Sequence, residues 1–161
     1  MLPPFARYAL RVDLADAAAA AGNTMPNATA PCRANVRGEW AALWLGPDEQ
    51  LLIGPDQAGV AFAASVGSAL REVPHSFVDV GHRQGAIEIT GPHAAALVNA
   101  GCPLDLDLAA TPVGFCSRTV LAKAEIVLWR RGDDHFHLDI WRSFMPYLAT
   151  FLSEVERELP G

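Results

Sequence analysis

The sequence offers few patterns of residues that could carry out chemistry, and the clearest one lies near the C-terminus. His135, His137 and Asp139 alternate along a segment that has the composition of a β-strand. Successive side chains of a strand point to opposite faces, so these three would share one face and could converge on a metal ion. The residues between them are apolar, and a solvent-facing side of a strand would show the same alternation. We therefore favour a structural interpretation over a metal site.

A second polar cluster occupies residues 79–84, where a strand is expected to turn back on itself in a hairpin. It contains Asp79, His82, Arg83 and Gln84. A carboxylate, an imidazole and a guanidinium together could position an anionic substrate or assist proton transfer. Turns use the same residue types for structure, with Asp79 or His82 bonding to turn amides and Arg83 pairing with an acid. We favour this structural use.

Tryptophan and arginine near the C-terminus are of the types that anchor protein interfaces. Trp129 lies in an apolar segment and is more typical of a core, whereas Trp141 and Arg142 follow a strand. The candidate interface or structural residues are therefore Asp79, His82, Arg83, Gln84, Trp141 and Arg142.

Motifs for cofactor binding and covalent catalysis are missing. No GxGxxG follows a strand and no GxxxxGK[ST] occurs, so a nucleotide held by a glycine-rich turn is not indicated. Ser68 follows Gly67 but lacks the second glycine of a nucleophile elbow. We expect no catalytic, cofactor-binding or metal-binding residue on this chain.

Composition indicates one globular domain spanning residues 1–161. Of its 161 residues 51% are hydrophobic and 19% charged, and the net charge of −6 argues against binding to nucleic acid or anionic lipid. No run of about 20 apolar residues could span a membrane. Cys32, Cys102 and Cys116 form no CxxC pair, which favours reduced thiols in a cytoplasmic protein.

A β-hairpin followed by a helix is the recurring unit of the expected fold. Trp40–Leu45 pairs with Gln50–Ile53, and a helix runs from Asp56 to about Leu70. In that helix, Asp56 would be the N-cap, and the apolar face would consist of Val60, Ala64 and Leu70.

Two further units follow the same scheme. Ser76–Val80 and Ala86–Thr90 are expected as strands, and a helix would run from Gly91 to about Gly101. The third unit pairs a long strand, Val120–Arg130, with Phe136–Ile140.

The chain ends are expected to complete this fold. Ser143 would cap a C-terminal helix that carries Pro146 in its first turn. Residues 5–12 could add an edge strand and 22–35 would form a loop. The fold class is α+β, a mainly antiparallel sheet with helices packed on one face.

Several segments together resemble the gamma subunit of heterotetrameric sarcosine oxidase, a family related to the folate-binding domain of glycine-cleavage T proteins. The resemblance runs from about Trp40 to the end, whereas residues 1–39 match poorly. Gln50 stands where the family usually has an aromatic residue, and Gly81 where it has a serine. The segments that carry the resemblance are Ala42-Leu43-Trp44-Leu45-Gly46-Pro47-Asp48-Glu49 with Leu51-Leu52, Val78-Asp79-Val80-Gly81-His82-Arg83-Gln84, Thr90-Gly91-Pro92, Gly101-Cys102-Pro103-Leu104-Asp105-Leu106, and Trp141-Arg142-Ser143-Phe144 with Tyr147-Leu148.

This resemblance implies a T-protein-like fold and a structural role in an enzyme complex. The partners would be alpha, beta and delta subunits that carry FAD, FMN, NAD and tetrahydrofolate. Such a complex oxidatively demethylates sarcosine or a related secondary amine acid to glycine, a one-carbon unit and hydrogen peroxide. The chain alone would not be catalytic. The alternative is a stand-alone folate-binding one-carbon protein.

Overall fold

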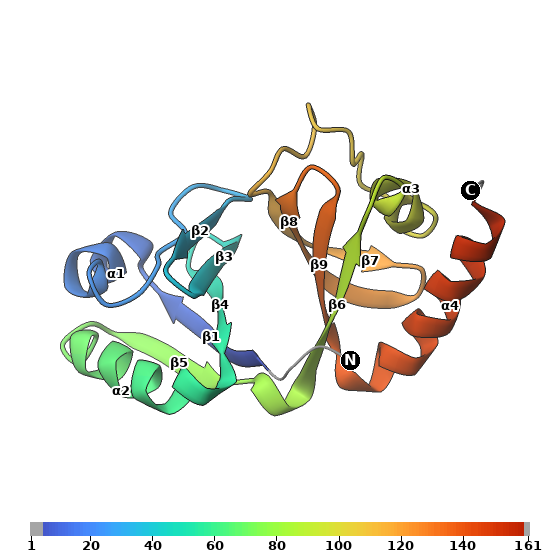
Figure 1. Ribbon diagram of the computed structural model, residues 1–161. Coiled ribbons are helices and arrows are strands. Elements are labelled where there is room, and N and C mark those ends of the chain that lie inside the picture. The colour runs from blue at the N-terminus through green and yellow to red at the C-terminus, as the bar shows by residue number, and fades with distance from the viewer. Residues whose placement is uncertain (1–4, 160–161) are drawn as a thin grey trace. The chain divides into compact units, whose positions relative to one another are not determined.

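The computed structural model describes residues 5–159, which divide into two compact units (Figure 1). We call residues 5–82 the N-terminal unit and residues 83–159 the C-terminal unit. The sequence predicted a single domain over 1–161, of which residues 1–4 and 160–161 lie outside the described residues. That the two units behave as one domain stays a prediction.

The N-terminal unit is built on a five-stranded antiparallel sheet with the order β2-β3-β4-β1-β5. The predicted hairpin of β3 and β4 is confirmed, with Leu43 opposite Leu51. The strands are β1 (Phe5–Val12), β2 (Ala34–Arg37), β3 (Trp40–Gly46), β4 (Glu49–Pro55) and β5 (His75–Asp79).

Strand β1 is central, so its prediction as an edge strand is wrong. Tyr8 pairs with Leu52 of β4 on one side and with Asp79 of β5 on the other. Its even-numbered residues, Tyr8 and Leu10 among them, are buried under the helices, which an edge position would not require. Neighbours this distant in sequence leave no local signal.

Two α-helices, α1 (Leu14–Ala21) and α2 (Gly59–Ala69), pack on one face of this sheet. The alanine-rich α1 was not predicted, although Asp13 caps it by accepting hydrogen bonds from the Ala15 and Asp16 amides at 2.8 and 3.1 Å. Such an N-cap satisfies amides that a helix start leaves unpaired.

Helix α2 differs from its prediction at its start and in its buried face. Asp56 is not an N-cap, because it lies inside the 3₁₀ turn η1 (Asp56–Ala58) that precedes α2. Of the predicted apolar face, Leu70 is buried, but Ala64 is exposed and Val60 is 86% exposed. Phe62 and Val66 face the sheet instead. Phe62 and Val66 lie two positions after Val60 and Ala64 and have larger side chains, so they determine which face of the helix is buried.

The C-terminal unit has a four-stranded antiparallel sheet with the order β6-β9-β8-β7. The predicted pairing of β5 with β6 is wrong, because β5 pairs with β1 and β6 with β9. The turn η2 (Gly81–Arg83) carries the chain out of the first sheet instead of closing a hairpin. The strands are β6 (Gln84–Thr90), β7 (Cys116–Leu121), β8 (Ala124–Gly132) and β9 (His135–Trp141).

The predicted pairing of residues 120–130 with Phe136–Ile140 is confirmed for β8, where Ile126 is opposite Ile140 of β9. The single strand is wrong, because a tight turn divides it into β7 and β8. Leu121 pairs with Ala124 across this turn, and Ala122 has a φ of 52°. This left-handed conformation favours glycine or asparagine. Because alanine occupies this position, no residue type here signals a turn.

Helices α3 (Ala94–Asn99) and α4 (Met145–Glu158) cover one face of the second sheet. Pro146 lies in the first turn of α4, as predicted. Ser143 is not the cap, because it belongs to the 3₁₀ turn η3 (Arg142–Phe144), and Phe144 occupies the cap position without a side-chain bond. None of the helices within residues 5–159 has the length and apolarity needed to cross a bilayer.

Candidate functional site

The side chains of His135, His137 and Asp139 share one face of β9, as the alternation predicted. That face is not solvent-facing, however, because His137 and Asp139 are each 1% exposed. The intervening Phe136 and Leu138 face α3 and α4 and are buried as well. Both faces of β9 are thus buried, and the favoured interpretation of an exposed polar edge is wrong.

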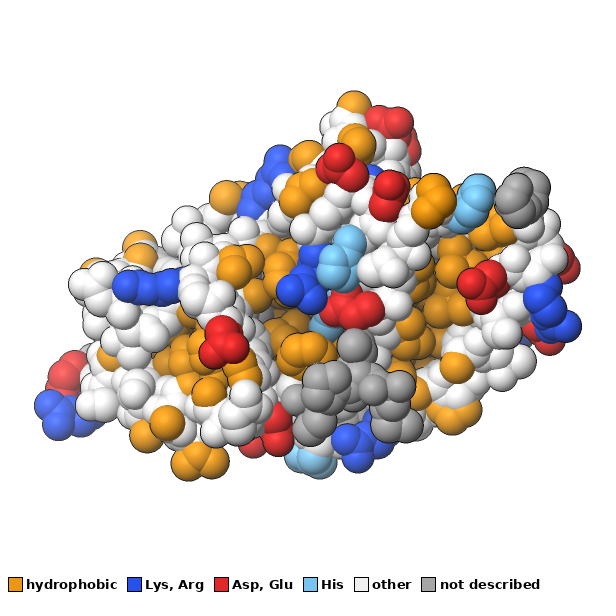
Figure 2. Space-filling view, viewed as in Figure 1, with side chains coloured by type: hydrophobic (Ala, Val, Ile, Leu, Met, Phe, Trp, Pro, Cys, Tyr) orange, Lys and Arg blue, Asp and Glu red, His pale blue; other side chains and the backbone are white. Residues whose placement is uncertain are grey.

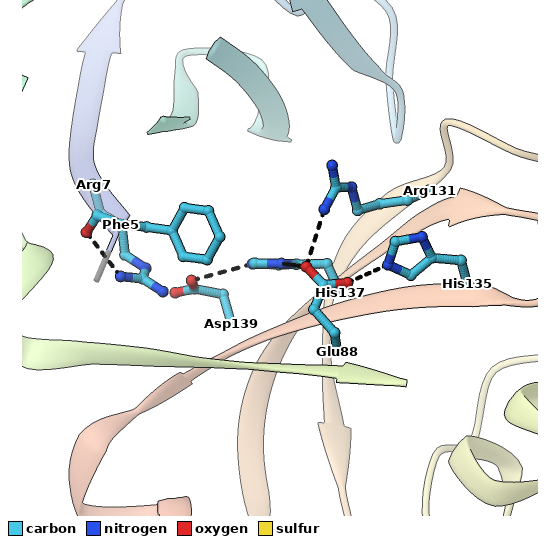
Figure 3. A network of polar contacts seen from close by, with 7 residues as sticks. All are labelled: Phe5, Arg7, Glu88, Arg131, His135, His137 and Asp139. Carbon is cyan, nitrogen blue, oxygen red and sulfur yellow. Dashed lines mark hydrogen bonds and ion pairs between the residues drawn. The ribbon is translucent and has the colours of Figure 1, made fainter. Parts of the chain in front are cut away.

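Glu88 of β6 is the centre of a polar network on this face (Figure 3). The Nδ1 atom of His137 lies 2.7 Å from Glu88 Oε1, to which Arg131 Nη1 also donates at 3.1 Å. His135 Nε2 contacts the other carboxylate oxygen, Glu88 Oε2. On its far side, His137 Nε2 faces Asp139 Oδ2 at 3.5 Å.

Strand register places these residues together. Glu88 is directly opposite His137 on the neighbouring strand, and Trp129 of β8 is opposite His137 on the other side. The rings of Trp129 and His137 lie 5.9 Å apart. Sequence reasoning missed Glu88, because a cross-strand partner 49 residues away is visible only when the pairing of β6 with β9 is known.

The network changes the protonation of its members. Burial alone would raise the pKa of Glu88, but the hydrogen bond and charge of His137, with help from His135 and Arg131, lower that pKa to about 2. Burial would lower the pKa of His137, yet its contacts with Asp139 and Glu88 raise it above the usual 6.5. A charged imidazolium between two carboxylates is the favoured state.

This arrangement suits an ion cluster better than a metal site. A histidine binds metal through the lone pair of a neutral ring, whereas both nitrogens of His137 face carboxylates that favour the charged ring. Among residues 5–159 no group of three or more potential ligands is placed to hold a metal ion. The network joins β6, β8 and β9 within one sheet.

The residues of the 79–84 cluster separate between the two units. Asp79 and His82 belong to the N-terminal unit, where Asp79 Oδ1 accepts a 2.8 Å hydrogen bond from the Gly81 amide, as its structural interpretation predicted. Arg83 and Gln84 belong to the C-terminal unit.

Arg83 and Gln84 instead meet Trp141. The Arg83 guanidinium lies 5.3 Å from the centre of the Trp141 ring, and Gln84 pairs with Trp141 across β6 and β9. Arg83 was expected to pair with an acid, but its contact is a cation–π interaction. Gln84 is buried, and its Oε1 atom has no hydrogen-bond donor in the part of the chain described.

Exposed aromatic rings continue from Trp141 into the start of α4. Trp141 is 46% exposed, Phe144 38% and Tyr147 40%, and Arg142 between them is exposed too. We call residues 141–147 together with Arg83 the aromatic segment. Trp, Tyr and Arg are the residue types most enriched among the energetic anchors of interfaces.

Residues 11–158 match the sequence profile described as the sarcosine oxidase gamma subunit family. This chain belongs to that family. The match includes β1 from Arg11 onward, so it extends further toward the N-terminus than the segments recognised from sequence motifs.

Curated gamma subunits show the same relationship. The chain is 32% identical over 141 residues to sarcosine oxidase subunit gamma from Corynebacterium sp. (strain P-1), covering 88% of this chain and 68% of that one. It is 33% identical over 121 residues to the subunit gamma from Arthrobacter sp., covering 75% of this chain and 58% of that one. These gamma subunits are therefore longer than this chain.

Solved structures agree with this membership. A chain of heterotetrameric sarcosine oxidase from Corynebacterium sp. U-96, in complex with pyrrole 2-carboxylate, matches with a TM-score of 0.86 at 26% identity over 98% of this chain and 82% of that one. The glycine cleavage system aminomethyltransferase T from Bartonella henselae matches with a TM-score of 0.67 at 13% identity, over 92% of this chain and 43% of that one. The second match shows the fold alone.

These findings confirm the predicted resemblance to gamma subunits and the predicted T-protein-like α+β fold. They also confirm the prediction of a subunit of a sarcosine oxidase-type oxidoreductase complex. They do not favour the alternative of a stand-alone folate-binding protein. The interface roles of individual residues stay predictions.

Proposed function

We propose that this chain is a non-catalytic structural subunit that docks onto its partners through the aromatic segment. The observation that carries the proposal is the exposed Trp141 ring beneath the Arg83 guanidinium, followed by exposed Phe144 and Tyr147. An exposed tryptophan already held by an arginine has little side-chain freedom to lose on binding. The family to which the chain belongs indicates that the complex is of the sarcosine oxidase type.

The chemistry of the complex would be carried by the partners. We place FAD, FMN, NAD and tetrahydrofolate on the alpha, beta and delta subunits, and none on this chain. The substrate would be sarcosine or a related secondary amine acid. The family match supports the type of complex, and the buried ion cluster of Glu88 and His137 is suited to holding strands together. We also propose a cytoplasmic location, because Cys32, Cys102 and Cys116 are widely separated and form no CxxC pair.

Co-expression of this chain with the other subunits of its host's sarcosine oxidase-type complex tests the proposal. The native chain should elute from a sizing column with the flavin absorbance of its partners. Trp141→Ala and Arg83→Ala should reduce its share of the complex by roughly tenfold, because they remove an interface anchor. Val60→Ala, an exposed change on α2, is the matched control and should leave assembly unchanged.

Elution of the native chain alone, apart from the flavin, would contradict the subunit role. Equal assembly of the native chain and both variants would contradict docking through the aromatic segment while leaving the subunit role intact.

A further inference from the structure

Residues 103–115, which belong to the connection between α3 and β7, are irregular but are held in place by hydrogen bonds from the buried Arg130. The Arg130 side chain is 2% exposed, and its Nη1 atom donates to Leu106 O at 2.9 Å and Thr111 O at 2.7 Å. Its Nη2 atom donates to Asp133 O at 2.6 Å and its Nε to Gly132 O at 3.3 Å. One guanidinium thus binds carbonyls of this loop and of the β8–β9 turn.

Further bonds fix the shape of the loop. Leu106 and Thr111 are buried, at 3% and 4% exposure, and the Thr111 amide donates to Asp107 O at 2.8 Å. Asp105 Oδ1 accepts from the Asp107 amide at 2.9 Å, and Asp107 Oδ1 accepts from the Ala109 amide at 2.8 Å. A compact loop packed by its own side chains is ordered before any partner arrives.

The outward side of this loop is apolar and acidic. Leu108 is 45% exposed and Val113 47% exposed, and Asp105 and Asp107 of the same loop are exposed as well. Residues 103–115 contain no lysine or arginine, and the adjoining turn adds Asp133 and Asp134. Figure 2 shows acidic and apolar side chains together on the projection at the top of the view, where Figure 1 places this loop.

We propose that residues 103–115 form a preformed docking loop that inserts Leu108 and Val113 into an apolar depression with a basic rim on a partner subunit. The inference rests on the proposed function and assigns a second contact surface, separate in sequence from the aromatic segment. Charge complementarity identifies the occupant, because Asp105 and Asp107 are exposed in a loop that has two exposed apolar side chains and no lysine or arginine, so they require lysine or arginine opposite them.

Other occupants fit this surface poorly. Nucleic acid and anionic lipid would be repelled by the carboxylates. A second copy in a two-fold arrangement would place the loop's carboxylates close to those of its twin, on a chain of net charge −6. The occupant that fits this surface is therefore a protein surface with positive charge.

The test measures the rates of association and dissociation of the native and variant chains with the rest of the complex at low and high salt. Leu108→Ser removes an exposed apolar contact and should speed dissociation roughly tenfold. The double variant D105N/D107N keeps the Oδ1 acceptors that bond the turn amides but removes two charges. It should slow association severalfold at low salt and lose much of the salt dependence of the native chain. Val60→Ser on α2 is the matched control for Leu108→Ser and should behave as native.

The outcomes separate the two proposals. If the native chain forms no complex, the proposed function fails, and the docking loop fails with it. If the native chain assembles and both loop variants match it in rate and salt dependence, the docking loop alone is overturned. Sedimentation of the isolated chain adds a third outcome: a homodimer that Leu108→Ser dissociates would make the occupant a second copy and overturn the assignment to a partner subunit.

Discussion

The two units have a similar architecture but differ in the side chains that are buried on the face of the sheet opposite the helices. Each has an antiparallel sheet with two α-helices on one face, and in each the inner strands are buried on the opposite face as well. In the N-terminal unit that face is mainly apolar, with Leu43 and Leu51 among its residues. In the C-terminal unit it holds His137 and Asp139. Apolar packing is insensitive to pH, whereas an ion cluster confines part of the stability to a range of pH.

In each unit, one buried polar side chain also holds a long loop in place through hydrogen bonds. Arg130 does so in the C-terminal unit, and Gln50 in the N-terminal unit. Gln50 is fully buried, accepts from the Ala28 amide at 2.9 Å and donates to Asn27 Oδ1 at 2.7 Å. Gln50, which stands where the family usually has an aromatic residue, therefore stabilises this loop.

Arg130→Met should have the largest effect on stability. The change retains the length of the side chain but leaves the buried carbonyls of Leu106 and Thr111 without their donor, at an expected cost of about 3 kcal/mol. Urea unfolding of the full chain measures it. Arg71→Met, at an exposed helix end, is the control and should change stability by less than about 0.5 kcal/mol. If both variants lost a similar amount of unfolding free energy, the hydrogen bonds of Arg130 would not be what stabilises the loop.

The pH dependence of the ion cluster comes next. The pKa of Glu88 is lowered from 4.5 to about 2, so its contribution is present above pH 4.5 and is lost as the pH falls toward 2. The pKa of His137 is raised from 6.5, so its contribution is complete below pH 6.5 and is lost as the pH rises through the raised value. The network should stabilise the protein most between these limits.

Glu88→Gln makes this prediction measurable. Removing the carboxylate should eliminate an acid-side loss of about 2 kcal/mol, as measured by urea unfolding between roughly pH 3 and pH 8. Glu154→Gln, on the exposed side of α4, is the control and should retain the native profile. If Glu88→Gln also kept that profile, the ion cluster would not distinguish the two units.

Gln50→Leu should produce a smaller effect, confined to the N-terminal unit. It leaves the Ala28 amide without its acceptor and should cost about 1.5 kcal/mol. Hydrogen exchange should show faster exchange of that amide while the C-terminal sheet stays protected. Gln57→Leu, at an exposed position of η1, is the matched control. An unchanged rate at Ala28 would contradict the fastening role.

Arg83→Ala should have the smallest effect on stability, below about 1 kcal/mol, because the cation–π contact with Trp141 is largely exposed. The same variant is expected to weaken assembly strongly. Thermal unfolding of the isolated chain, set against sizing of the co-expressed complex, compares the two effects. A large loss of stability would make the contact part of the fold and not of the interface.

The sequence predicted best what is local. The hairpin of β3 and β4 and the first turn of α4 around Pro146 follow from turn residues and spacing, and the structure confirms both. Failures came from long-range pairing and from turns without their usual residues. The partners of β5 and β6 lie far away in the chain, and Ala122 makes a turn that alanine does not signal.

In the candidate site, too, the local features could be predicted and the long-range ones could not. Alternation placed His137 and Asp139 on one face, which is a local property. Their burial and their partner Glu88 depend on strand order, which no local pattern encodes. The meeting of Arg83 with Trp141 is likewise a consequence of the pairing between β6 and β9.

The central position of β1 has a consequence for how the chain folds during synthesis. Tyr8 must wait for Leu52 and then for Asp79 before β1 has both neighbours, and the ring of Phe77 stacks on Tyr8 at 4.8 Å. Pairing across such separations makes folding slow. The first sheet therefore stays incomplete on the ribosome until β5 emerges, and during that interval the edge of β1 that later pairs with β5 has no neighbouring strand and is open to chaperones.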